Sequence, residues 1–159
     1  MKLILGSGLL LGVLVAVWMC IMGYTGWYKD PTKAGLFFLV VPIQVAVLIV
    51  VLRHTAAHGR GWRAQLMAGT VVSIVAALVI FAASMLFTTV LFPNYFEELR
   101  VVQEQLMREA GMGEVEIQRQ IEAAARNQTP IGYAFSGFLG TMVVGVISSA
   151  VIGIFMRAR

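Results

Sequence analysis

The chain has 159 residues, a formal net charge of +4 and a strongly apolar composition. Hydrophobic residues make up 59% of the positions and charged residues only 13%, whereas soluble domains carry about 25% charged residues. This composition excludes an ordinary soluble domain and predicts an integral membrane protein that contacts the lipid bilayer. The basic residues are divided among short segments beside apolar runs. They form no basic face, which argues against a nucleic-acid partner.

Four long apolar runs predict an all-α polytopic membrane protein with four transmembrane helices. In a single membrane domain, the predicted spans cover residues 3–23, 34–52, 65–92 and 131–156. As a helix the first run is about 31 Å long, which is too long for the apolar core of a typical signal peptide. No small-residue cleavage site follows it. We therefore expect an uncleaved first span.

The only long polar segment, 94–128, separates the third and fourth spans, and it contains seven of the eight acidic residues. Apolar residues recur at helical spacing in both of its halves, which predicts two amphipathic helices. Gly111 and Gly113 predict the turn between them. We expect a helical hairpin that docks a membrane or periplasmic protein, or another copy of the chain. Its candidate partner surface consists of Leu99, Val102, Leu106, Ile117 and Ile121.

The distribution of basic residues predicts how the chain is threaded through the membrane. Lys2, the loop 53–63 and the C-terminal Arg157 and Arg159 all belong on the cytoplasmic side by the positive-inside rule. An even number of spans satisfies all of them together. We expect both termini in the cytoplasm, residues 93–130 outside it, and a location in a bacterial cytoplasmic (inner) membrane.

Small residues at i+4 spacing predict faces where helices pack closely in lipid. The second span has almost none, so we expect it at the periphery of the bundle or at a subunit boundary. The candidate packing positions are Gly8, Gly12 and Ala16 in the first span, Gly69, Ser73 and Ala77 in the third, and Gly137, Thr141, Gly145, Ser149 and Gly153 in the fourth.

Two pairs of residues are candidate polar sites. Pro42 and Gln44 in the second span form a possible polar membrane site, because a membrane proline frees a carbonyl and a buried glutamine needs a partner. A packing kink is the favoured alternative, since no charged residue accompanies them. His54 and His58 are one helical turn apart and are weak metal candidates. No nearby Asp, Glu or Cys completes the coordination, so we expect interfacial loop residues and no metal or cofactor.

The absence of charged residues inside the spans bears on function. Proton-coupled pumps and carriers of charged substrates generally need ionisable groups within the bilayer. No glycine-rich phosphate loop or nucleophile elbow occurs either, so we expect no enzymatic activity from this chain. The favoured function is that of a structural or accessory membrane protein whose hairpin is an interaction surface. A small transporter or channel subunit is the alternative.

Several short motifs together suggest a family. They are Met22-Gly23-Tyr24 at the end of the first span, the basic loop leading to Gly69, Phe92-Pro93, Glu114–Ile117 after the turn, and Thr129-Pro130 before the last span. With these motifs the chain resembles the bacterial domain-of-unknown-function family 4199, a group of small four-span membrane proteins. Arg63-Ala64-Gln65 departs from the Ser-Phe-like start of the third span in that family. The resemblance implies a bacterial inner-membrane location, and it implies no activity, cofactor or catalytic residue.

Overall fold

The computed structural model describes residues 2–59, 61–126 and 128–155, and this part of the chain is helical with short connections. Four helical stretches are long and apolar enough to cross a membrane, so the chain is a multi-pass membrane protein. The predicted all-α fold with four spans is confirmed. The stretches are α1 (Lys2–Thr25), the continuous α2–η2–α3 stretch (Pro31–Ala57), α4 with the π-helical η3 (Trp62–Leu91), and α7 (Pro130–Phe155).

The second stretch changes helix type along its length. A single α-helical turn, α2 (Pro31–Ala34), is followed by the 3₁₀ segment η2 (Gly35–Leu39) and then by α3 (Val40–Ala57). Pro42 is the third residue of α3, where a missing backbone N–H removes no hydrogen bond within that α-helix. The change of helix type in this span therefore precedes Pro42.

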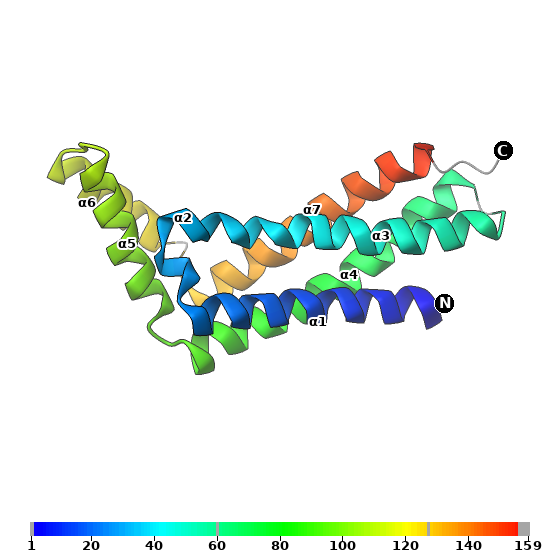
Figure 1. The fold of residues 1–159 in the computed structure, drawn as a ribbon, viewed down its shortest axis with the longest axis horizontal. Helices are drawn as coiled ribbons and strands as arrows, with labels where there is room; N and C mark the ends of the chain where they lie inside the picture. The colour runs from blue at the N-terminus through cyan, green and yellow to red at the C-terminus, as the bar shows by residue number, and fades with distance from the viewer. Residues whose placement is uncertain (1, 60, 127, 156–159) are drawn as a thin grey trace.

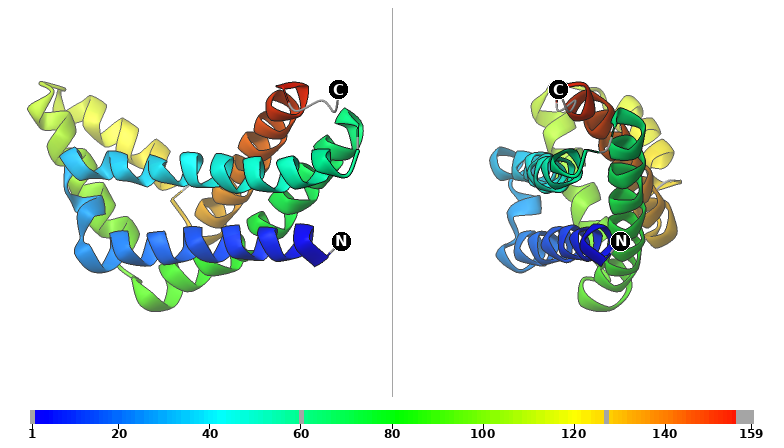
Figure 2. Two further views of the ribbon diagram at one scale, coloured as in Figure 1. Left: turned by 45° about the vertical axis from the view of Figure 1, so that its right-hand side comes forward. Right: turned by 90° about the vertical axis from the view of Figure 1, so that its right-hand side faces the viewer.

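α4 is the centre of the bundle. Its contacts with α7 and with α1 are the most extensive in the structure, and α3 makes smaller contacts with α1, α4 and α7. Seen along the bundle in Figure 2, α1 and α3 lie on one side, and α4 and α7 on the other. α3 thus has the more peripheral position expected for the span with almost no small residues.

Glycines of α1 allow close contact with α4. A side chain at Gly12 would place its Cβ 2.5 Å from the Cβ of Val79, and one at Gly8 would place its Cβ 2.8 Å from the carbonyl oxygen of Val72. Hydrophobic burial gives little driving force for association in lipid, so close van der Waals contact of this kind is what holds two membrane helices together.

The interface of α4 with α7 pairs two glycines, one from each helix, with serines of the opposite helix. A Cβ at Gly69 would lie 2.5 Å from the Cβ of Ser149, and a Cβ at Gly145 would lie 2.6 Å from the Cβ of Ser73. Each serine hydroxyl donates to its own helix, Ser73 to the Gly69 carbonyl at 2.9 Å and Ser149 to the Gly145 carbonyl at 2.7 Å. The hydroxyls are thereby satisfied inside an otherwise apolar contact.

The other predicted packing positions differ in burial. Gly153 is buried beside Trp62. The remaining ones are Ala77 and Thr141, which are buried, and Ala16 and Gly137, which are half-buried.

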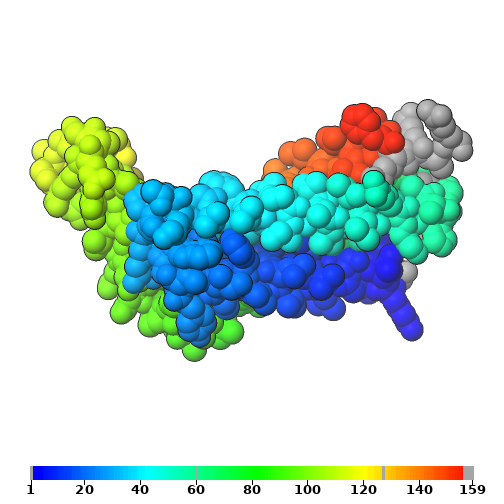
Figure 3. Space-filling model, in the orientation of Figure 1, coloured from blue at the N-terminus to red at the C-terminus, as the bar shows by residue number. Residues whose placement is uncertain are grey.

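The polar hairpin between the third and fourth spans is also confirmed. It consists of α5 (Tyr95–Glu109) and α6 (Glu114–Ala125), and Gly111 between them has a φ of 77°, a conformation that favours glycine. In Figure 1 the hairpin lies at one end of the bundle and runs across the helix axes, whereas α1 begins at the other end, near the α3–α4 connection. The tip of the hairpin projects beyond the bundle (Figure 3).

Some residues used for the predicted topology have no described placement. Arg60, Arg157 and Arg159, and the predicted last residue of the fourth span, Met156, lie outside the described residues.

Candidate functional site

One glutamate attaches the hairpin to the bundle. The Tyr28 hydroxyl in η1 (Trp27–Lys29) donates a hydrogen bond to the Glu98 carboxylate of α5, and Lys29 Nζ lies 2.9 Å from Glu98 Oε2. The hydrogen bond from Tyr28, followed by that from Lys29, lowers the pKa of Glu98. Burial and the adjacent carboxylate raise the pKa of Tyr28, so its hydroxyl stays protonated and able to donate. We refer to Tyr28, Lys29 and Glu98 as the latch.

Aromatic rings fill the junction between the hairpin and the bundle. Tyr95, the first residue of α5, is buried, and burial raises its pKa. Its ring centroid lies 4.9 Å from that of Tyr28, 5.3 Å from that of Phe87 and 5.5 Å from that of Tyr133. Rings at these separations attract one another beyond their burial alone. We call this group the aromatic collar, and its members are Tyr28, Phe87, Phe92, Tyr95, Phe96 and Tyr133.

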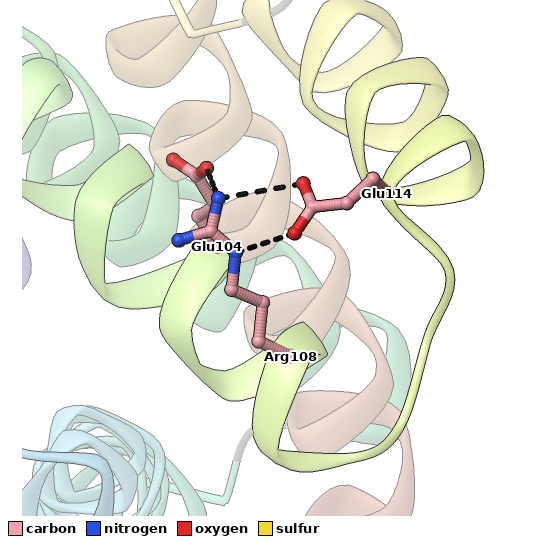
Figure 4. A network of polar contacts seen from close by, with 3 residues as sticks. All are labelled: Glu104, Arg108 and Glu114. Carbon is pink, nitrogen blue, oxygen red and sulfur yellow. Dashed lines mark hydrogen bonds and ion pairs between the residues drawn. The ribbon is translucent and has the colours of Figure 1, made fainter.

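Polar contacts close the hairpin on itself. Arg108 of α5 lies within 2.7 Å of Glu104, one turn earlier, and within 3.0 Å of Glu114 at the start of α6 (Figure 4). After α6, the Gln128 amide donates to Gln103 Oε1 at 3.0 Å and accepts from Arg100 Nε at 3.2 Å. The two helices are therefore joined near their turn and again near their base.

The predicted partner surface is only partly exposed. Ile117 is completely buried (0% exposed), so it packs inside the protein and cannot contact a partner. Leu99 is half-buried against the aromatic core, Val102 and Ile121 are also half-buried, and Leu106 remains exposed. Helical periodicity identified the apolar faces correctly, but these faces are used largely within the molecule.

Other apolar residues of the hairpin face outward instead. Val115 is 78% exposed and Val101 is 64% exposed, and Met112 in the turn is exposed as well. They do not lie three or four positions from the buried apolar residues of the hairpin, and for this reason the apolar periodicity of the sequence did not identify them.

Two neighbouring cavities lie within the half of the bundle that carries the hairpin. The outer one, of about 440 Å³, is lined by residues of the aromatic collar and by Leu99 and Gln103 of α5. The inner one, of about 290 Å³, extends to Gln44 of α3 and Thr141 of α7. The two cavities share four lining residues, Met19, Phe37, Phe38 and Tyr133. Of the described residues that line either cavity, none is charged.

The predicted pair Pro42 and Gln44 is separated in the structure. Gln44 is buried, lines the inner cavity and donates from Nε2 to the Thr141 carbonyl oxygen at 2.8 Å. Pro42 is exposed on the outside of α3 and does not line the cavity. The polar position of this span is therefore Gln44 alone, with Thr141 as its partner.

His54 and His58 lie together at the end of the bundle opposite the hairpin. Their ring centroids are 4.4 Å apart, both side chains are exposed, and His58 Nδ1 is 2.8 Å from the His54 carbonyl oxygen. Within the described residues, no group of three or more His, Cys, Asp or Glu side chains is placed to hold a metal ion. The pair thus supplies at most two ligands, fewer than the three or four protein ligands of a zinc site.

Comparison with known proteins gives a family and no activity. The model of a family described as "protein of unknown function (DUF4199)" matches residues 7–158, nearly the whole chain. No curated protein and no solved structure matches the chain.

Proposed function

We propose that this chain, which belongs to the DUF4199 family, is an accessory protein of a membrane assembly that presents its α5–α6 hairpin to a partner protein. The observation that carries the proposal is the attachment of the base of the hairpin to the bundle. The latch and the aromatic collar hold its base, and Gln128 after α6 bonds to Gln103 of α5. A surface ordered in advance binds a partner without the entropic cost of ordering a flexible segment.

The charge of the hairpin indicates the chemistry of the partner. Helices α5 and α6 contain seven glutamates and three arginines, and most of the glutamates are exposed. An acidic surface is repelled by anionic lipid headgroups and by nucleic-acid phosphates, and it is complementary to a basic protein surface. The exposed Val101 and Val115 add apolar contact area. We therefore propose a membrane or periplasmic protein with a basic surface as the partner.

The orientation that we propose follows from the described basic residues. Lys2, Arg53 and Arg63 lie at the ends of helices that meet at the end of the bundle opposite the hairpin (Figure 1). Short basic segments are retained on the cytoplasmic side. The hairpin is then extracytoplasmic, in the periplasm if the host is a Gram-negative bacterium, and the protein resides in the cytoplasmic membrane.

The experiment that tests the proposal is purification in mild detergent from native membranes, followed by mass spectrometry of the associated proteins. Glu97 and Glu122 are exposed, and reversing them with Glu97→Lys and Glu122→Lys changes the charge of the hairpin without touching the latch. A partner with a basic surface is expected to be lost from this variant and to dissociate in high salt. The matched control, Glu97→Asp with Glu122→Asp, is expected to retain it. Recovery of the same proteins with both variants, or of the chain alone, would overturn the proposal.

A small transporter or channel subunit is the second candidate, and the inner cavity with buried Gln44 favours it. The uncharged lining restricts such a role to neutral solutes. Flux of neutral solutes into liposomes that contain the protein, abolished by Gln44→Leu, would support this function. The absence of flux across a broad panel would reject it.

We also propose that the chain is not itself an enzyme, since its sequence contains no catalytic motif. A metal that co-purifies with the protein and disappears from a variant carrying His54→Ala and His58→Ala would contradict this.

A further inference from the structure

The inner cavity has a polar floor near the middle of the membrane. Thr141, which accepts the hydrogen bond from Gln44, lies eleven residues into α7, or about 17 Å from the start of that helix at 1.5 Å per residue. The hydrocarbon core of a bilayer is about 30 Å thick. Gln44 and Thr141 are therefore at the depth where water is scarcest and an unmet hydrogen-bonding group is most costly.

Gln44 has an unused acceptor at this depth. Its side chain is 98% buried, with only 2% exposed, and its Nε2 is committed to the Thr141 carbonyl. Among residues 2–59, 61–126 and 128–155, none donates a hydrogen bond to its Oε1. Because Gln44 lines the inner cavity, this oxygen is available to a molecule that enters it.

Ser84 also lines the inner cavity, and its hydroxyl is weakly satisfied. The hydroxyls of Ser73, Thr141 and Ser149 each donate to a carbonyl of their own helix at 2.7–2.9 Å. The buried Ser84 hydroxyl donates instead to the thioether sulfur of Met19 at 3.9 Å. Sulfur is a weak acceptor, so Ser84 can exchange this bond for a better one.

The rest of the lining is suited to hydrocarbon. Phe37, Phe38, Val41 and Ile80 line the inner cavity, and Met19 and Phe37 continue into the outer one. Phe38 is 72% exposed on the surface of the second span, next to the lipid phase. A ligand can therefore approach from the bilayer, and a charged group would find no counter-charge among the described lining residues.

We propose that the inner cavity binds a neutral lipid that carries a free hydroxyl group, with the hydroxyl donating to Gln44 Oε1 and the hydrocarbon chain lying between Phe37, Phe38 and Met19. This site does not depend on the hairpin or its partner, and it is tested separately.

The test uses the full-length protein in phosphatidylcholine nanodiscs and a sixteen-carbon alcohol with a photoreactive diazirine in its chain. After illumination, mass spectrometry locates the adducts. Competition compares 1-hexadecanol with hexadecyl methyl ether, which has nearly the same shape but no donor. We expect adducts on cavity residues such as Phe37 and Met19, and about three- to tenfold better competition by the alcohol, the value of one net hydrogen bond.

Variants connect this preference to Gln44. Gln44→Leu is expected to remove the advantage of the alcohol over the ether, while Thr70→Val retains it, since the Thr70 hydroxyl bonds to the Leu66 carbonyl of its own helix. If Gln44→Leu does not fold, Gly140→Leu replaces it. A Cβ at Gly140, which lines the inner cavity, has nothing within 4 Å, and we expect the leucine side chain to occupy part of the cavity and to reduce its labelling. Adducts spread evenly over lipid-facing residues, or equal competition by alcohol and ether, would overturn the proposal.

Discussion

At the scale of single residues, the contact between α4 and α7 depends on four residues that fit in pairs. Each serine occupies the space left by the missing side chain of the opposite glycine, Ser149 at Gly69 and Ser73 at Gly145. The serine hydroxyls bond to their own helices, so the fit depends on shape and not on a bond between helices. A change in either partner of a pair should therefore be compensated by the other.

Gly69→Ala is expected to destabilise the bundle by about 1–3 kcal/mol, because the new Cβ collides with Ser149 and overpacks the interface. Combining it with Ser149→Gly is expected to restore much of the loss, as coupled neighbours do in a double-mutant cycle. Thermal unfolding in detergent measures the effect. Gly140→Ala is the control, since its Cβ meets nothing within 4 Å, and it should leave stability unchanged or slightly higher.

We expect the stability of the folded protein to depend on pH through Glu98 of the latch. The pKa of this carboxyl group is lower in the folded protein than in the unfolded chain. The stabilisation by ionised Glu98 is therefore fully present above the ordinary glutamate pKa of about 4.3. The contribution is lost as the pH falls from there through the lowered pKa. We expect the difference in melting temperature between the wild type and Glu98→Gln to be present at pH 7 and to shrink below about pH 4. A difference that is constant with pH would show that the Glu98 charge is not involved.

At the scale of elements, the hairpin is held together more by burial than by its ion pairs. Arg108 bonds to Glu104 and Glu114 at the surface, where screening by water leaves such pairs little net effect. Ile117, by contrast, is the fully buried residue of α6. The apolar contact should therefore determine whether α6 stays packed on the rest of the molecule.

Ile117→Ala is expected to cost about 2–5 kcal/mol of the local stability of α6, the range for truncating a fully buried isoleucine. Amide hydrogen exchange of residues 114–125 measures this loss directly. Arg108→Ala and the exposed control Val115→Ala should change protection of α6 little. Equal loss of protection in Ile117→Ala and Val115→Ala would contradict the buried placement of Ile117.

The elements that could be predicted from the sequence are those whose signal is local. The four spans follow from runs of apolar residues, the hairpin turn from Gly111, and the packing faces of α1, α4 and α7 from the spacing of small residues. Whether an apolar helix face is buried inside the protein or left exposed depends on which other elements contact it in the folded structure. Periodicity therefore could not show that Ile117 is buried inside the protein, or that Glu98 of α5 meets Tyr28, seventy residues earlier.

At the scale of the whole molecule, the two ends of the bundle differ in chemistry. One end carries the acidic hairpin on its aromatic collar, and the other carries the start of α1 with Lys2, the last turns of α3 with Arg53 and the start of α4 with Arg63. The chemical difference between these two ends makes the orientation of the protein open to direct measurement.

Gln44 could be identified from the sequence as a candidate polar site, but its cavity could not, because a cavity arises where several helices fail to fill the space between them.

Cysteine labelling is expected to place the hairpin outside the cell. In a Cys20→Ser background, which removes the only natural cysteine, Val115→Cys should react with a membrane-impermeant maleimide on intact cells. His58→Cys, at the other end, should react only after the membrane is permeabilised. Both side chains are exposed in the structure, so accessibility within the protein does not limit either reaction. The reverse pattern would overturn the proposed orientation.

The serine–glycine pairing between α4 and α7 can form only late in synthesis. The central helix α4 is made well before α7, and the whole hairpin must leave the ribosome between them. At about 5–20 residues per second, the grooved face of α4 at Gly69 and Ser73 has no partner helix for several seconds. A nascent chain that stops before α7 leaves this face of α4 open to lipid, without the helix that fills it in the complete protein.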